Sequence, residues 1–452
     1  MKKSGIPSIL FLLAVVFVCS EAVAQKTKTL TLDQATGIAL EQNLQVAQAL
    51  NNIESAQSGV LAAYGSYLPR LSASSGWGRS GSETGPTTQS IGGVAFDVPG
   101  STRWTSNYSA NITAFYTLFD GFGREARFNS AKSNEAQVEQ SYVRTKQQIV
   151  YSVQNSYLNV LKFEQQVKVT EENLNKDKKL LERITEQHRV GALPIGDLYR
   201  QQSAVAQDEY NLIAAQNTYN KAKADLLSLI GVDVNEEYTI VDPSIAGQLT
   251  QVQSDPPVQS LGSFDDLRRR AFESRPDYSN ATEAVRAAEH GITSAWSRYY
   301  PSVGANTSFS SGANEFSQLG KNKNYNLGLS VSWTLFDGFT TNQQIQSANV
   351  GKRNSELALQ QTERQISVEL KKALLDLEAA RKQYDASQKA LVSATQDRRV
   401  AEERYNLGSG TLLDLQVANT NLLSAQVTAV NNSYNYLIQK KNFELVMGAG
   451  RY

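Results

Sequence analysis

Charge of one sign, cysteine and histidine are all scarce in this chain of 452 residues. The 44 lysines and arginines equal the 44 aspartates and glutamates, so the basic excess with which nucleic-acid binders neutralise phosphates is missing. With one cysteine, the chain cannot form a disulfide scaffold. With one cysteine and two histidines, it offers few ligands for a cysteine- or histidine-bound metal centre. No phosphate loop of the Walker type occurs, and neither His188 nor His290 has a nucleophile at catalytic spacing. We therefore expect no enzyme, catalytic residue, cofactor, metal site or nucleic-acid partner.

Long apolar runs are also missing, apart from one near the start of the chain. Two lysines precede the apolar run 9–18, and Ala22-Val23-Ala24 supplies the small residues of a signal-peptidase site. Residues 1–24 therefore predict a secretory signal peptide. A membrane anchor is the weaker alternative, because the run is about half the roughly 20 residues that span a bilayer. Without further apolar runs, a protein of this sequence enters a membrane only as strands.

The chain repeats itself. Leu118-Phe119-Asp120-Gly121-Phe122 returns as Leu335-Phe336-Asp337-Gly338-Phe339, 217 positions later, and the same offset relates Gly191 to Gly408. We therefore predict one repeat at 25–231, a proline-bearing linker at 232–262 and a second repeat at 263–452. The first copy carries about fifteen extra residues, which we place in a surface loop at 79–106.

Each repeat predicts a helix, two strands, a very long helix, a turn and a final helix. Residues 124–188 contain neither proline nor glycine, and their apolar residues recur at spacings of three, four and seven. About 65 helical residues rising roughly 1.5 Å each make rods of about 100 Å, which must pack lengthwise as coiled coils. The expected strands are about 69–80, 107–118, 301–310 and 324–335; the long helices are about 124–188 and 340–406, and the final helices about 197–230 and 412–447.

The predicted strands alternate apolar and polar residues. Segments 107–118 and 325–335 carry no charge, and small polar residues form one face of each. A half-buried strand of a soluble sandwich is one interpretation; a lipid-facing wall around a wet lumen is the other, favoured by aromatic residues near the strand ends. Four strands in lipid leave unpaired edges, so several copies must close the sheet, and three chains would supply twelve strands.

In its duplicated order, its LFDGF junctions and its two glycine-bearing helical turns, the chain resembles the TolC-like outer-membrane efflux proteins (outer membrane factors) across residues 30–448. The resemblance implies an α plus β membrane protein: a homotrimer whose 12-stranded β-barrel, four strands per chain, lies in outer-membrane lipid and continues as a long α-helical coiled-coil barrel in the periplasm. It also implies two partners, a periplasmic adaptor (membrane fusion) protein and an inner-membrane pump or ABC transporter. Asp120, Gly121, Asp337 and Gly338 mark the strand-to-helix junctions.

The same resemblance assigns the two helical turns to the periplasmic tip, where the adaptor docks. The residues implied in adaptor contact are Val190, Gly191, Ala192, Leu193, Leu407, Gly408, Ser409 and Thr411. Helix capping alone also explains the two glycines, so a purely structural role for these turns stays open.

By likeness to the family, Asp197, Tyr405 and Asp414 line or brace a closed entrance at the tip. Asp197 and Asp414 equally suit the positive N-termini of the helices they begin, and a hydrogen bond between Tyr405 and Asp197 is a further prediction. Gly410 stands where the family pattern has an arginine and Val417 where it has a second aspartate. An acidic constriction therefore rests on Asp414 alone.

Two functions of different classes follow. The first is a passive exit duct of a tripartite efflux or type I secretion system, opened by the adaptor and the pump. The second is a structural coiled-coil tether of the cell envelope without a transport role. Uncharged lipid-facing strands with a polar inner face favour the duct.

Overall fold

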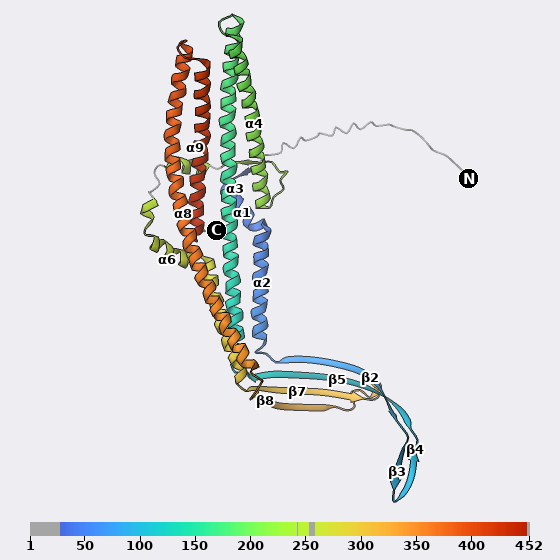
Figure 1. Cartoon of the computed structure of the whole chain (residues 1–452). Helices are drawn as coiled ribbons and strands as arrows, with labels where there is room; N and C mark the ends of the chain where they lie inside the picture. The colour runs from blue at the N-terminus through green and yellow to red at the C-terminus, as the bar shows by residue number, and fades with distance from the viewer. Residues whose placement is uncertain (1–27, 242, 253–257, 450–452) are drawn as a thin grey trace, which may run out of the picture.

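The chain folds into two long helical hairpins that stand side by side, with a β-sheet projecting from their shared base (Figure 1). The computed structural model describes residues 28–241, 243–252 and 258–449, so the predicted signal peptide lies outside the described residues. The first hairpin consists of α3 (Gly123–Arg189) and α4 (Ile195–Ile230), and the second of α8 (Thr340–Asn406) and α9 (Leu412–Val446). Within the described residues, no helix combines the length and the hydropathy of a membrane span.

The two longest helices, α3 and α8, have 67 residues each, or about 100 Å at 1.5 Å per residue. A stripe of apolar residues is buried along each, which follows the spacing seen in the sequence. Next to the sheet, α2 (Leu44–Gly65) packs against α3, and α7 (Pro276–Trp296) packs against both α3 and α8. Shorter helices, α1 (Leu32–Gln42) and α6 (Phe264–Ser274), pack along the middle of the long helices.

Four antiparallel strands form the projecting sheet in the order β2-β5-β7-β8. Their bounds are Arg70–Thr84, Ser101–Phe119, Ser302–Ala313 and Asn324–Ser332. The loop predicted at 79–106 is wrong: β2 and β5 run on into that segment, and β3 (Thr87–Ile91) and β4 (Val94–Val98) form a hairpin beyond them. The strand predicted to end at 335 stops at Ser332.

The segment predicted as a linker, 232–262, carries secondary structure of its own. Strand β6 (Tyr238–Ile240) pairs in parallel with β1 (Lys28–Leu30), and α5 (Pro243–Gln251) and the short 3₁₀ helix η2 (Val258–Leu261) follow. Beside this strand pair, the Tyr157 hydroxyl of α3 donates to the carbonyl of Leu30 at 2.8 Å. The linker therefore packs against the middle of the molecule.

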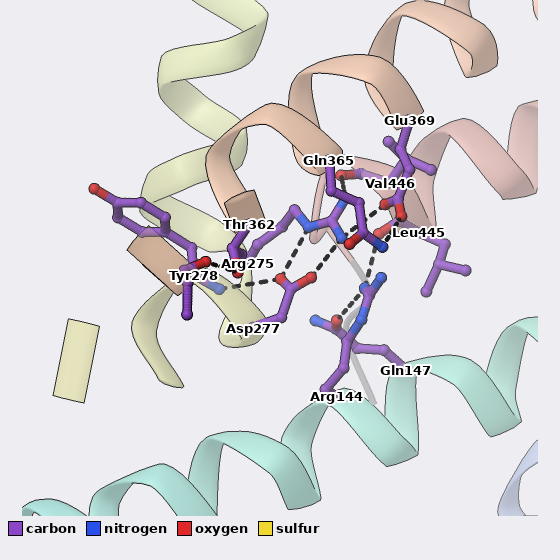
Figure 2. Close-up of polar contacts among 11 residues, drawn as sticks. Arg144, Gln147, Arg275, Asp277, Tyr278, Thr362, Gln365, Glu369, Leu445 and Val446 are labelled. Atoms are coloured by element: carbon purple, nitrogen blue, oxygen red, sulfur yellow. Dashed lines mark hydrogen bonds and ion pairs between the residues drawn. The ribbon is translucent and has the colours of Figure 1, made fainter. Parts of the chain in front are cut away.

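The buried side chain of Arg275 links three helices in the second half of the chain (Figure 2). The Arg275 side chain, 1% exposed between α6 and α7, contacts Asp277 at 2.5 Å and Glu369 of α8 at 2.9 Å. Its Nη1 also donates to the carbonyl of Val446, at the end of α9, at 3.3 Å. Burial opposes the charged form, but the two carboxylates outweigh it and raise the pKa of Arg275 above its ordinary value. The arginine thus ties three helices to one point.

Candidate functional site

The register of the sheet gives it one apolar and one polar face, because residues paired across antiparallel strands point the same way. The apolar face includes the paired rows Ile112–Phe309–Tyr325, Ala114–Thr307–Leu327 and Tyr116–Ala305–Leu329. The alternate rows are mostly small and polar: Asn111–Ser310–Asn324, Thr113–Ser308–Asn326 and Phe115–Asn306–Gly328.

The apolar face is left uncovered in the single chain. Leu327 is 85% exposed and Leu329 is 77% exposed, and large apolar side chains continue along β2 at Leu71 and Trp77. Soluble monomers seldom expose so continuous an apolar surface.

The two outer strands of the sheet, β2 and β8, each pair with one neighbour only. β2 extends over 15 residues and β8 over nine, and each presents one row of backbone groups that no other described strand pairs. Long edges of this kind are templates for pairing with another strand. The sheet is therefore open on both sides in the isolated chain.

Both strand-to-helix junctions turn through two consecutive left-handed residues. Gly121 and Phe122 each have φ of 67°, and in the second copy Gly338 and Phe339 have φ of 64° and 66°. Left-handed backbone costs a non-glycine residue about 1–2 kcal/mol. At position 121 there is also no room for a side chain, because a Cβ on Gly121 would lie 2.5 Å from the backbone oxygen of Ser297. Gly121 is therefore required by the close approach of Ser297, whereas a Cβ at Gly338 would meet no atom within 4 Å and only the left-handed φ favours glycine there.

The aspartates of the two junctions have different partners. Asp120 lies 2.8 Å from the Arg127 guanidinium and 3.6 Å from Nε of Arg124. Asp337 instead accepts from the backbone and hydroxyl of Thr341, at 2.8 Å and 2.6 Å, and so caps α8. One junction is held by ion pairs and the other by a helix cap.

The turn between α3 and α4 is a glycine-terminated helix end. Gly191 has φ of 76°, and Ala192 donates to the carbonyl of Gln187 at 2.8 Å. His188 Nδ1 lies 2.9 Å from the carbonyl of Leu193, whose side chain packs against the cluster described below. Val190 is exposed at the apex.

The turn between α8 and α9 has the same form but ends in a capping box. Gly408 has φ of 73°, and Ser409 donates to the carbonyl of Arg404 at 2.9 Å. The Thr411 hydroxyl accepts from the backbone of Asp414 at 3.2 Å, and the Asp414 carboxylate accepts from the backbone of Thr411 at 3.0 Å. Leu407 is exposed at the apex, as Val190 is in the other turn.

The two hairpins meet just behind these turns. Leu180 and Ile184 of α3 pack with Leu412 and Leu415 of α9, and Tyr405 lies against this cluster. The two turns are therefore held in fixed relation to each other.

The predicted hydrogen bond between Tyr405 and Asp197 is not formed. Asp197 pairs instead with Arg200 at 3.1 Å. The Tyr405 hydroxyl is buried without a hydrogen-bond partner in the described part of the chain, and its ring lies under Arg183 at 5.6 Å. Burial raises the pKa of Tyr405, as does the nearby charge of Asp197.

Hydrogen bonds with Thr411 hold Asp414 in place. Asp414 faces Arg404, which the sequence alone did not indicate as its partner. The hydrogen bonds from Thr411 lower the pKa of Asp414, and the charge of Arg404 adds to that effect. Arg404, Gly410, Asp414 and Val417 line one cleft of about 360 Å³. An arginine thus faces Asp414 although position 410 is glycine.

A buried carboxyl pair between the tip and the middle of the hairpins escaped the sequence analysis. Asp177 of α3 and Asp208 of α4 are both buried and hydrogen bond to each other. Burial, with the neighbouring carboxyl, raises the pKa of Asp208 to about 7. The signal was available, since Asp177 lies three residues from Leu174 and Leu180, on the apolar stripe of its helix.

Comparison with known proteins agrees with this geometry. The family model for outer membrane efflux proteins matches the chain twice, over residues 36–232 and 267–449. The chain belongs to that family. It is 24% identical over 406 residues to the pyoverdine export outer membrane protein OpmQ of Pseudomonas aeruginosa, covering 88% of this chain and 81% of that one. It is 22% identical over 317 residues to the outer membrane protein TolC of Escherichia coli, covering 68% and 63%.

Among solved structures, the outer membrane channel CmeC of Campylobacter jejuni has the same fold. Its TM-score is 0.72 at 18% identity, with 93% of this chain and 86% of that chain covered. The chain is thus an outer membrane protein of the efflux channel family, with its helical part in the periplasm. Its relatives are channel proteins rather than enzymes.

Proposed function

We propose that three copies of this chain close their sheets edge to edge into a 12-stranded barrel, with β8 of each copy pairing with β2 of the next. The two unpaired edges of each sheet support this arrangement, because three pairings of this kind leave no open edge. The uncovered apolar face then meets lipid, and the polar face lines a lumen. Eight strands would leave an interior filled by side chains, whereas twelve leave an aqueous one.

The function that this geometry supports best is a passive exit duct of a tripartite efflux or type I secretion system. The observation that carries it is the register of the sheet, which places most of the large apolar side chains of the four strands on one face and most of the asparagines on the other. A tether has no use for a wet inner face. The energy for transport comes from an inner-membrane pump or ABC transporter.

The turns at 190–194 and 407–411 form the site at which a periplasmic adaptor docks. Val190 and Leu407 present exposed apolar side chains at the two apices, which suits a protein partner. Asp197, Tyr405 and Asp414 lie directly behind these apices and constrict the entrance in the trimer, where three copies of Asp414 would favour cations.

Ion conductance across planar bilayers tests the duct. Purified protein should give step-like currents, and Asp414→Ala should change their cation preference if Asp414 lines the constriction. Absence of currents from both the wild type and Asp414→Ala would favour the tether.

A crosslinker at Ser409→Cys tests the docking site. Ser409 is exposed in the turn, so the variant should fold normally and capture a periplasmic adaptor in cells. A matched cysteine at exposed Ser260, in the middle of the molecule, should not capture it. Equal capture at both positions would contradict docking at the tip.

A further inference from the structure

A cleft on the polar side of the sheet, at its base, is lined by three arginines and one aspartate. The cleft, of about 590 Å³, lies where β2, β5, β7 and β8 meet the ends of α2 and α3. Arg70, Arg124 and Arg127 line it, and among the described residues Asp120 is its one acidic lining group. A cavity of this size accommodates a small organic molecule.

The register places the cleft on the polar face. Arg70 of β2 pairs with Phe115 of β5. Thr117 of β5 pairs with Gly304 of β7, which in turn pairs with Ser330 of β8. Phe115, Thr117 and Ser330 all line the cleft. These residues share the face that carries asparagines and serines further along the strands, so the cleft opens toward the lumen of the proposed trimer.

The positive charge in the cleft is only partly neutralised. Asp120 contacts Arg127 and lies near Arg124. Three arginines and one aspartate leave the cleft of each chain with a net charge of +2. In the part of the chain that the structure describes, no carboxylate lies within ion-pair distance of the exposed Arg70 guanidinium. Nearby Arg298 and Asp337 line an adjoining cleft and cancel each other in charge.

The arginines differ in how firmly they are held. Arg124 is 12% exposed; its Nη2 donates to the carbonyl of Leu118 at 3.1 Å, and its guanidinium lies over the Tyr67 ring at 5.3 Å. Its Nε is buried without a hydrogen-bond acceptor among the described residues. Arg127 is 54% exposed, with one carboxylate partner. Arg124 is therefore a fixed charge, whereas Arg70 has no ion-pair partner among the described residues and Arg127, paired with Asp120 through Nη2, keeps further N–H groups for a ligand.

We propose that this cleft binds small oxyanions, carboxylates or phosphates, and that three copies form a cationic collar where the barrel joins the helical tunnel. Guanidinium groups bind such oxyanions with paired hydrogen bonds, and a cleft lined by one sign of charge concentrates the opposite ion. The collar rests on the proposed trimeric duct, whereas binding in the cleft of each chain does not.

Calorimetric titration of the detergent-purified full chain at low salt tests the binding, with citrate and inorganic phosphate as probes. Arg70→Gln and Arg127→Gln should each weaken binding, and together by about tenfold or more. Arg268→Gln, in an exposed ion pair with Asp265 on α6, is the matched control and should bind as the wild type does. Binding of citrate alone would assign the cleft to polycarboxylates, and binding of both would assign it to oxyanions in general.

No heat from the wild type with either probe would overturn the proposal. So would an affinity equal to that of the wild type in both Arg70→Gln and the double variant. Arg70 has no described ion-pair partner, so loss of folding does not complicate that variant. In planar bilayers, the double variant should also shift the reversal potential toward cation selectivity. Binding without currents would refute the duct and keep the site, and currents with an unchanged reversal potential would refute the collar.

Discussion

The carboxyls of Asp177 and Asp208 hydrogen bond to each other in the seam between α3 and α4. Asn173 donates to Asp208 at 2.7 Å, and Asn419 of α9 approaches Asp177 at 3.5 Å. The charge of Arg398 of α8 acts to lower the pKa of Asp177, against the larger effect of burial. Two buried carboxyls so close cannot both ionise easily, so the pair holds one proton.

This pair predicts that the helical hairpins are more stable in mild acid than in mild base. The ordinary pKa of an aspartate is 3.8, and the folded protein raises that of Asp208 to about 7. Between these values the folded state holds a proton that the unfolded chain has released, so the free energy of unfolding falls as pH rises and levels off above about 7.

Asp208→Asn should remove that dependence. It should stabilise the protein at pH 8 by about 1–3 kcal/mol, since one buried charge is gone, and change little at pH 5. Thermal unfolding followed by circular dichroism at both pH values measures the effect, with exposed Glu209→Gln as the control. An equal change in the unfolding temperature of Asp208→Asn at the two pH values would contradict a shared proton.

Removing the Tyr405 hydroxyl should leave the tip intact. Because the hydroxyl is buried without a partner among the described residues, Tyr405→Phe should be neutral or stabilise by up to about 1 kcal/mol. Its conductance should match the wild type, whereas Tyr405→Ala, which removes the ring beneath Arg183, should raise the conductance. A large conductance increase in Tyr405→Phe would indicate a hydrogen-bonded latch.

Breaking the Arg275 cluster should strongly destabilise the protein. Arg275→Leu leaves Asp277 and Glu369 without their shared cation in a partly buried site, which costs about 3–5 kcal/mol. Denaturant unfolding is the measurement, and Arg269→Leu on the exposed side of α6 is the control. A loss below about 1 kcal/mol would show that the cluster contributes little to stability.

The two faces of the sheet should respond oppositely to charge. Leu327→Arg places a cation on the apolar face and should cost about 2–4 kcal/mol if that face meets the bilayer midplane. Asn326→Arg, one residue away on the polar face, should assemble normally and shift ion selectivity instead. Insertion into outer membranes and heat resistance of the assembled particle distinguish the two. Similar defects in both variants would contradict the assignment of the faces.

The sequence was sufficient to predict the long helices and the strand alternation, because period and length are local properties. The predicted helix 124–188 differs from α3 by one residue at each end. The β3–β4 hairpin was missed because its glycine- and serine-rich flanks resemble a loop, and the pairing of β2 with β5 that extends them joins distant segments.

At the candidate site, the turns were predictable from glycine and proline, but the contacts behind them were not. Which donor the Asp197 carboxylate accepts from depends on side-chain packing in α4, and the donor is Arg200 rather than Tyr405. The pairing of Asp177 with Asp208 and the convergence of Arg70 with Arg124 and Arg127 join residues of different elements, which no local pattern reveals.

The number of chains in the native particle tests the central claim most directly. Native mass spectrometry of the protein extracted from outer membranes in mild detergent should give three copies, since three sheets are needed to close the barrel. A particle of one chain, with its apolar sheet face covered by its own helices, would contradict the account.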